Sequence, residues 1–270
     1  MRHFRQAMLA LLLLISFIAY AHADLEVHFI DVGQGDAALL ICDGEAMLID
    51  GGQPSASQLI YTYLRERVPE LKYMIATHPH EDHIGGCAAA LNAVPVGLIL
   101  SPVTEWDTRA FNSMVKYAEA QGTEIFVPFE GDVYQLGGSE ITVIHCWPEA
   151  WTSNDMSIVV RVDYGATSFL FTGDAERMSE YMMIDSGFVL EADVLKVAHH
   201  GSSSSSTLEF LEAVNPEYAI ISCGKNNSYG HPHQQVIDRL NGNAVILRTD
   251  ELGTIIFHSD GETLSYINVK

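Results

Sequence analysis

The 270-residue sequence is short of basic side chains and of cysteine, and both shortages exclude classes of protein. It has 14 Lys and Arg against 35 Asp and Glu, which gives a formal net charge of −21 at pH 7. So acidic a chain is a poor non-specific binder of nucleic acid or anionic lipid. Its four cysteines include no Cys-x-x-Cys pair, which argues against a zinc knuckle and favours buried free thiols.

Long apolar runs are also scarce. The only one lies near the first residue. Arg2 and Arg5 precede an apolar run at 8–20, and the small-x-small sequence Ala21-His22-Ala23 follows it. This order predicts a secretory signal peptide over residues 1–23 and an exported protein. The run is short for a membrane span of ~20 residues, so we favour cleavage over an uncleaved anchor and expect no stable span afterwards. Loss of Arg2 and Arg5 would change the net charge from −21 to −23.

Strand and helix patterns alternate along the rest of the chain, and no linker divides them. Apolar residues recur at helical spacing over 58–68, and short apolar runs such as 37–42 and 194–197 indicate strands. A stretch richer in strands, at 124–171, separates two alternating regions. This order predicts a single α/β domain over residues 24–270, in which two mixed β-sheets pack face to face with helices outside.

The sharpest chemical signal is the sequence His-Pro-His-Glu-Asp-His at positions 78–83, which follows an apolar strand at 73–76. A loop that leaves a strand can direct its first two histidines at one metal ion and fold the later Asp and His around a second. Imidazole and carboxylate suit Zn, Mn or Fe. Gly85 and Gly86 follow, and we expect them to let the next helix approach the metals or an anionic substrate. The four candidate metal ligands are His78, His80, Asp82 and His83.

A second signal is Thr172-Gly173-Asp174 after the apolar run at 168–171. A carboxylate at a buried strand end needs a partner. Asp174 is therefore a candidate bridging ligand, because its two oxygens suit the ~3.5–4 Å spacing of two-metal sites.

Two later histidine motifs supply further candidates. His199 and His200 follow the strand at 194–197, and adjacent side chains at a strand end point to different sides. One could bind metal while the other faces substrate or a carboxylate, and the sequence leaves their order open. His231 could complete the site, protonate a leaving group or cap a helix. Ser202 and the serines after it are candidate phosphate contacts, with helix capping an equal alternative.

These motifs resemble the metallo-β-lactamase superfamily, and within it the metallo-hydrolase domain of ComEC-type competence proteins. The resemblance implies an αββα sandwich with two divalent ions, Zn or Mn, at the sheet edges. It implies His78, His80, Asp82, His83, Asp174 and one of His199 and His200 as ligands. Many superfamily hydrolases carry another ligand histidine before the Gly-Asp strand, where this chain offers Asn154, or His145 further upstream. The motifs that carry the resemblance are Phe29–Asp36, Leu48–Gly52, Thr77–Gly86, Thr172–Glu176, Asp193–Ser202 and Tyr229–Pro232.

Two metal ions and a metal-activated water favour hydrolysis of a phosphoester, with Asp82 or Asp174 orienting the water. The resemblance favours a phosphodiesterase or nuclease, with DNA or a cell-envelope polymer as substrate and no protein partner. The net charge opposes tight DNA binding unless the metals and a basic patch of Lys196, Lys225 and Arg248 offset it. The alternatives are an exported phosphocholine-type esterase, or a non-catalytic accessory protein that binds metal. A β-lactamase or lactonase fits the later motifs less well.

Overall fold

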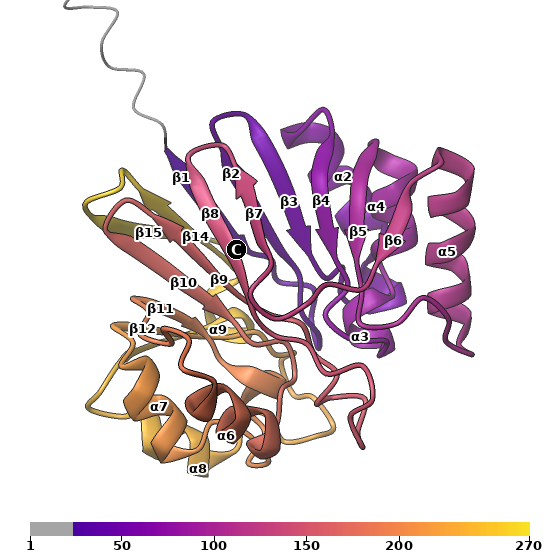
Figure 1. The fold of residues 1–270 in the computed structure, drawn as a ribbon. Helices are drawn as coiled ribbons and strands as arrows, with labels where there is room; N and C mark the ends of the chain where they lie inside the picture. Colours follow the sequence, from indigo (N-terminus) through magenta and orange to yellow (C-terminus); the bar gives the residue numbers. More distant parts are fainter. Residues whose placement is uncertain (1–23) are drawn as a thin grey trace, which may run out of the picture.

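The computed structural model describes residues 24–270, and the predicted signal peptide lies outside them. Two β-sheets face each other (Figure 1). The eight-stranded sheet has the order β15-β14-β1-β2-β3-β4-β5-β6, and it is parallel from β3 to β6 and antiparallel elsewhere. Its strands are β1 (Leu25–Phe29), β2 (Ala38–Cys42), β3 (Glu45–Ile49), β4 (Leu71–Ile75), β5 (Val96–Leu100), β6 (Glu124–Phe126), β14 (Thr254–Ser259) and β15 (Leu264–Val269).

The seven-stranded sheet has the order β13-β12-β11-β10-β9-β8-β7. It is parallel from β10 to β13 and antiparallel from β7 to β10. Both sheets are therefore mixed, as the sequence predicts. The strands are β7 (Val133–Leu136), β8 (Ser139–His145), β9 (Val159–Tyr164), β10 (Thr167–Phe171), β11 (Val194–Lys196), β12 (Tyr218–Ile221) and β13 (Val245–Arg248).

Helices cover the outer face of each sheet, which completes the predicted αββα sandwich (Figure 1). Helices α2 (Ser57–Arg67), α4 (Cys87–Ala93) and α5 (Arg109–Gln121) pack on the first sheet. Helices α6 (Arg177–Ser186), α7 (Leu208–Val214) and α8 (Gln234–Leu240) pack on the second. Within residues 24–270, no helix combines the length and apolar character needed to cross a membrane. Short helices are η1 (Pro54–Ala56), α3 (Glu81–Ile84), η2 (Ala198–Gly201) and α9 (Thr249–Leu252).

The space between the sheets is filled by aromatic rings from both. Phe29 stacks on Phe171 across the interface, with ring centroids 5.7 Å apart. Phe257 meets Phe29 and Phe169 edge-on, at 6.1 Å in each case. All four rings are buried, so their apolar area and offset geometry hold the sheets together. The four cysteines are buried and free, as predicted: Cys42, Cys87, Cys146 and Cys223.

Two segments differ from the sequence-based expectation, and both lie at the site. The sequence predicts a strand from Met156, but β9 begins at Val159 because residues 151–156 form turns. The His-rich motif, predicted as a loop, folds at Glu81–Ile84 into the short helix α3. These departures place Ser153 and Asn154 beside the histidines and put Asp82 and His83 on one helical turn.

Candidate metal centre

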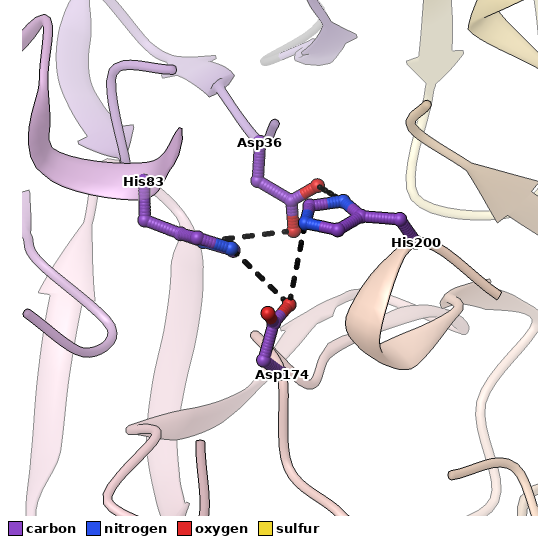
Figure 2. Close-up of side chains that lie close together, drawn as sticks. All are labelled: Asp36, His83, Asp174 and His200. Carbon is purple, nitrogen blue, oxygen red and sulfur yellow. Dashed lines mark ion pairs between the residues drawn. The ribbon is translucent and has the colours of Figure 1, made fainter. Parts of the chain in front are cut away.

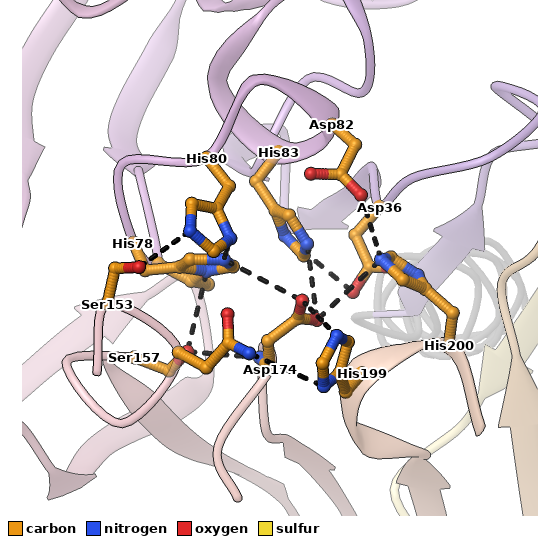
Figure 3. Close-up of polar contacts among 12 residues, drawn as sticks. Asp36, His78, His80, Asp82, His83, Ser153, Ser157, Asp174, His199 and His200 are labelled. Carbon is orange, nitrogen blue, oxygen red and sulfur yellow. Dashed lines mark hydrogen bonds and ion pairs between the residues drawn. The ribbon is translucent and has the colours of Figure 1, made fainter. Parts of the chain in front are cut away.

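The predicted ligands follow the carboxyl ends of strands from both sheets. His78 and His80 come after β4 of the first sheet, Asp174 follows β10, and His199 and His200 follow β11 of the second. Because β3–β4–β5 and β10–β11–β12 are parallel, their carboxyl ends share an edge of each sheet. Figure 3 shows the side chains converging there. The packing of the two sheets therefore assembles the site.

One cluster gathers around Oδ2 of Asp174. This oxygen lies 3.7 Å from Nε2 of His78 and 3.8 Å from Nε2 of His199. Nε2 of His78 is in turn 3.0 Å from Nδ1 of His80. The far nitrogen of His80 bonds the hydroxyl of Ser153 at 2.6 Å, which leaves Nδ1 directed inward. Three imidazole nitrogens thus lie near one carboxylate oxygen.

A second cluster gathers around Oδ1 of the same aspartate (Figure 2). This oxygen lies 3.2 Å from Nε2 of His83 and 3.7 Å from Nε2 of His200. Oδ2 of Asp82 is 3.3 Å from Nε2 of His200. Asp174 therefore presents one oxygen to each cluster, which is the arrangement predicted for a bridging ligand.

Several atoms at the second cluster are buried without a hydrogen-bond partner. They are Oδ1 of Asp174 and the Nε2 atoms of His83 and His200. Buried polar atoms normally have a partner, and a cation bound by lone pairs supplies one. The donor set also fits a divalent transition metal, because it consists of imidazole and carboxylate. The residues present therefore fit a two-ion site.

Both adjacent histidines reach Asp174 because of an unusual backbone. His199 and His200 have φ values of 50° and 55° within η2. Left-handed backbone is costly for residues other than glycine and is retained where surrounding contacts fix it. Nδ1 of His199 is fixed by Glu176 and Ser204, each at 3.2 Å. Both rings therefore lie within 3.8 Å of the Asp174 carboxylate, His199 at Oδ2 and His200 at Oδ1.

A carboxylate that the sequence analysis gave no role supports His83. Oδ2 of Asp50 lies 2.8 Å from Nδ1 of His83. The same carboxylate accepts hydrogen bonds from the backbone N–H of Thr77 at 2.9 Å and from its hydroxyl at 2.7 Å. An acceptor behind the ring fixes the tautomer that leaves Nε2 free for a metal.

Asp36 plays the corresponding part behind His200 and was likewise missed. Its Oδ1 lies 3.2 Å from Nδ1 of His200, which also bonds the Ser222 carbonyl at 3.0 Å. Ligand-type atoms of Asp36, His83, Asp174 and His200 all lie within 4.8 Å of one another. Because Asp36 faces the Nδ1 side of the ring, we read it as a support for His200. The signal in the sequence is an aspartate directly after Gly33-Gln34-Gly35, at the start of a buried strand.

Lys196 completes this support, since its Nζ lies 2.6 Å from Oδ2 of Asp36 and both side chains are buried. Burial raises the pKa of Asp36, but Lys196 and His200 outweigh it and bring the value to about 2. We expect Lys196→Met to lower the free energy of unfolding by about 3 kcal/mol, because it removes the buried charge that pairs with Oδ2 of Asp36. Urea denaturation measures the loss, with the exposed Lys225→Met as control. Equal stability of the two variants would contradict the assigned pair.

The carboxylates also raise the basicity of the imidazoles they surround. Burial lowers the pKa of His200, but Asp174 and Asp36 outweigh it and raise the value to about 9. The pKa of His83 is raised well above its usual range for the same reason, by Asp174 and Asp50 against burial. Without metal, the surrounding carboxylates therefore favour the protonated form of both rings.

Metal binding should consequently release protons. Nε2 of His83 and of His200 must lose a proton before it can bind a cation. We expect the affinity for Zn²⁺ or Mn²⁺ to rise between pH 6 and pH 9 and to level off above the raised pKa of His200. Calorimetry in two buffers of different ionisation enthalpy counts the protons released at pH 7. An affinity independent of pH over this range would contradict the protonation states inferred for His83 and His200.

The residues predicted to contact substrate, Gly85, Gly86 and Ser202, make packing and hydrogen-bond contacts within the protein. Gly85 and Gly86 serve close backbone packing, because a Cβ on Gly86 would lie 2.1 Å from the Gly51 carbonyl oxygen and one on Gly85 2.4 Å from Pro54. Ser202 is buried, and its hydroxyl lies 3.0 Å from that of Ser204, which contacts His199. The serines thus support a histidine in this structure.

Asn154 and His145 are the two candidates for the position where many superfamily hydrolases carry a further ligand histidine. The amide nitrogen of Asn154 bonds Glu176 at 3.2 Å and lies 3.5 Å from Nδ1 of His199. His145 instead pairs with Glu130 at 2.9 Å. Asn154 therefore lies at the site, behind His199, while His145 has a structural partner.

The clusters open into a cavity of about 290 Å³, whose walls also include Gln34, Tyr229 and His231. Burial, followed by the rings of His200 and His199, lowers the pKa of His231 to about 4. His231 is therefore neutral at pH 7. A larger hollow of about 750 Å³ lies beside α5, but its walls hold no cluster of ligand-type side chains.

Comparisons with known proteins agree with this geometry. The sequence model of the Metallo-beta-lactamase superfamily matches residues 30–225. The chain is 32% identical over 258 residues to ComE operon protein 3 of Bacillus subtilis, covering 85% of this chain and 32% of that protein. It is 32% identical over 257 residues to Competence protein ComA of Neisseria gonorrhoeae, covering 92% and 35%. The chain thus spans about a third of the length of these relatives.

Solved structures share the fold at low sequence identity. The metallo-beta-lactamase fold protein YhfI from Bacillus subtilis superposes with a TM-score of 0.58 at 12% identity, covering 88% of this chain and all of that one. Igni18, a metallo hydrolase from Ignicoccus hospitalis, superposes with a TM-score of 0.56 at 15% sequence identity. The match covers 92% of this chain and 100% of that one. With two facing mixed sheets, buried His/Asp clusters at their edges and a family match over most of its length, the chain belongs to the metallo-beta-lactamase superfamily.

Proposed function

We propose that this protein is a phosphodiesterase that uses two metal ions, and that nucleic acid is its substrate. The observation that carries the proposal is the position of Asp174, whose two oxygens face two separate groups of imidazoles. His78, His80 and His199 would hold one ion, and Asp82, His83 and His200 the other, with Asp174 shared. Zn and Mn both suit this donor set.

Bound in this way, the two ions would supply an activated water and neutralise charge on a phosphoryl oxygen. The protein's own residues hold the ligand side chains in place and orient the attacking water. Asp50 and Asp36 fix the rings of His83 and His200 from behind. Asp82, whose carboxylate is partly exposed to the cavity, can accept a hydrogen bond from an attacking water. His231 lies in the same cavity, and its neutral ring can form a hydrogen bond with a leaving group.

Further parts of the proposal concern substrate and location. The similarity to Competence protein ComA supports nucleic acid over other phosphodiesters. The predicted signal peptide supports an exported enzyme, for which an envelope polymer is the other substrate to test. Lys196 and Arg248 do not support the basic patch considered above. Lys196 is buried against Asp36, and Arg248 pairs with Asp250 at 2.7 Å.

Elemental analysis of the purified protein, combined with hydrolysis of bis(p-nitrophenyl) phosphate, tests the proposal. We expect two metal ions per chain and turnover that depends on added Mn²⁺ or Zn²⁺. His83→Ala should lose turnover and bind at most one ion per chain, because it removes a buried ligand of the second cluster only. Bound metal without turnover on any phosphodiester would favour a metal-binding accessory role, and failure to bind either metal would overturn the proposal.

A further inference from the structure

We infer that Gln34 and Tyr229 form a subsite for the nucleoside next to the scissile phosphate. Tyr229 would stack on an unpaired base, and the side-chain amide of Gln34 would donate a hydrogen bond to a phosphoryl oxygen. This inference rests on the proposed function and names the part of the substrate that the protein recognises. It concerns residues outside the metal clusters that line the same cavity.

Tyr229 is an exposed aromatic ring on a well-fixed loop. Its side chain is 62% exposed, although it lines the cavity of the metal centre. The ring lies nearly parallel to that of His231, with centroids 5.6 Å apart and 21° between planes. Aromatic rings at the surface of a binding groove stack on bases, a contact that strengthens binding about 5- to 150-fold per base. Among the described residues that line this cavity, Tyr229 is the only phenol, phenyl or indole ring.

Hydrogen bonds fix the loop before any substrate arrives. The side-chain oxygen of Asn227 accepts from the backbone N–H groups of Tyr229 and His231 at 3.1 and 3.0 Å. Its side-chain nitrogen donates to the carbonyl groups of Gly224 and His231 at 2.9 and 2.6 Å. His233 bonds the Tyr229 carbonyl at 3.3 Å. A loop held in this way loses little backbone freedom when a base stacks on the Tyr229 ring.

Gln34 supplies the polar half of the subsite. Its Oε1 accepts a hydrogen bond from the Gly224 N–H at 3.1 Å, which directs the amide group and ties it to the loop of Tyr229. Its Nε2 is buried and has no partner. Because a buried donor without an acceptor is costly, a partner on the bound molecule is expected. A phosphoryl oxygen is the acceptor that a phosphodiester brings into this cavity.

The charge of the protein favours recognition of this kind. The full sequence has a net charge of −21. Of the three cations considered for a basic patch, Lys196 and Arg248 are already paired, and only Lys225 is exposed. Stacking and a neutral amide donor do not depend on positive charge. Binding should accordingly change little with salt, unlike that of proteins that release many counterions.

Two phosphodiesters with the same leaving group test the subsite: thymidine 5′-(p-nitrophenyl phosphate) and methyl p-nitrophenyl phosphate. The wild-type protein should prefer the thymidine ester in kcat/KM by about tenfold, the ratio that stacking of one base provides. Tyr229→Ala should reduce this preference about tenfold, and Tyr229→Phe should keep it. Gln34→Glu retains an oxygen for the Gly224 N–H but loses the donor. It should raise KM for both esters alike.

The controls separate this inference from the proposed function. Phe129→Ala removes an exposed ring that does not line the cavity. It should leave kcat/KM for both esters unchanged. Hydrolysis of neither ester by the wild type would overturn the proposed function. Hydrolysis of both without a preference, or with a preference that survives in Tyr229→Ala, would overturn the subsite alone. So would a preference that disappears at 0.5 M salt, since charge rather than stacking would then be its source.

Discussion

Asp174→Asn is expected to reduce hydrolysis of bis(p-nitrophenyl) phosphate by at least about 1,000-fold, which corresponds to about 4 kcal/mol of lost transition-state stabilisation. Asparagine has the same shape, but it directs an N–H group at one of the two imidazole clusters and removes the negative charge. Neither cluster then has the shared carboxylate that lies 3.2 to 3.8 Å from four histidines. Metal content, measured on the same samples, should fall below one ion per chain.

The matched control is Asp185→Asn, which makes the same chemical change at an exposed position of α6. It should retain wild-type activity and metal content. If Asp174→Asn melts at the temperature of the metal-free wild type, the lost activity does not come from unfolding. Two bound ions and a tenth or more of the activity in Asp174→Asn would contradict a shared ligand at this position.

Removal of metal should lower the melting temperature by about 10 °C. The candidate ligands come from both sheets, so bound ions stabilise the packing of one sheet on the other. A ligand that binds only the folded state at 1,000 times its Kd adds about 4 kcal/mol, and each kcal/mol moves the midpoint of a domain of this size by about 2–4 °C. Thermal unfolding with and without a chelator measures the shift, and added Mn²⁺ or Zn²⁺ should reverse it.

His78→Ala supplies the internal comparison for that experiment. It removes a buried member of the first cluster, so the chelator should shift its melting temperature less than that of the wild type. A wild-type protein that melts at the same temperature with and without chelator would show that the site does not couple the two sheets.

Much of the fold follows from local pattern. Helix α2 (Ser57–Arg67) lies within one residue, at each end, of the span 58–68 that apolar spacing predicts. The start of β9 differs from the prediction. Met156 belongs to an apolar run by composition, but it lies in the turn that places Ser153 and Asn154 at the site. Tertiary contacts with His80 and His199 decide the conformation there, and no short window of sequence contains them.

The same distinction holds for the site. The motif at 78–83 is visible in the sequence because its ligand types are adjacent. The part played by His199 depends on a left-handed backbone that residue types other than glycine rarely adopt. Asp36 stayed hidden because a single aspartate after glycine is typical of an ordinary turn, and Lys196, its partner, lies 160 positions away. Long-range pairs of this kind only become visible in three dimensions.

The four buried free thiols make local opening of the structure measurable by chemical labelling. Each is shielded in the native state, two of them in the packing between the sheets and one on either outer side. A thiol reagent can therefore react only after the layer around a cysteine has opened, and labelling rates report the free energy of that opening. Peptide mapping of the modified cysteines would give the order in which the layers separate.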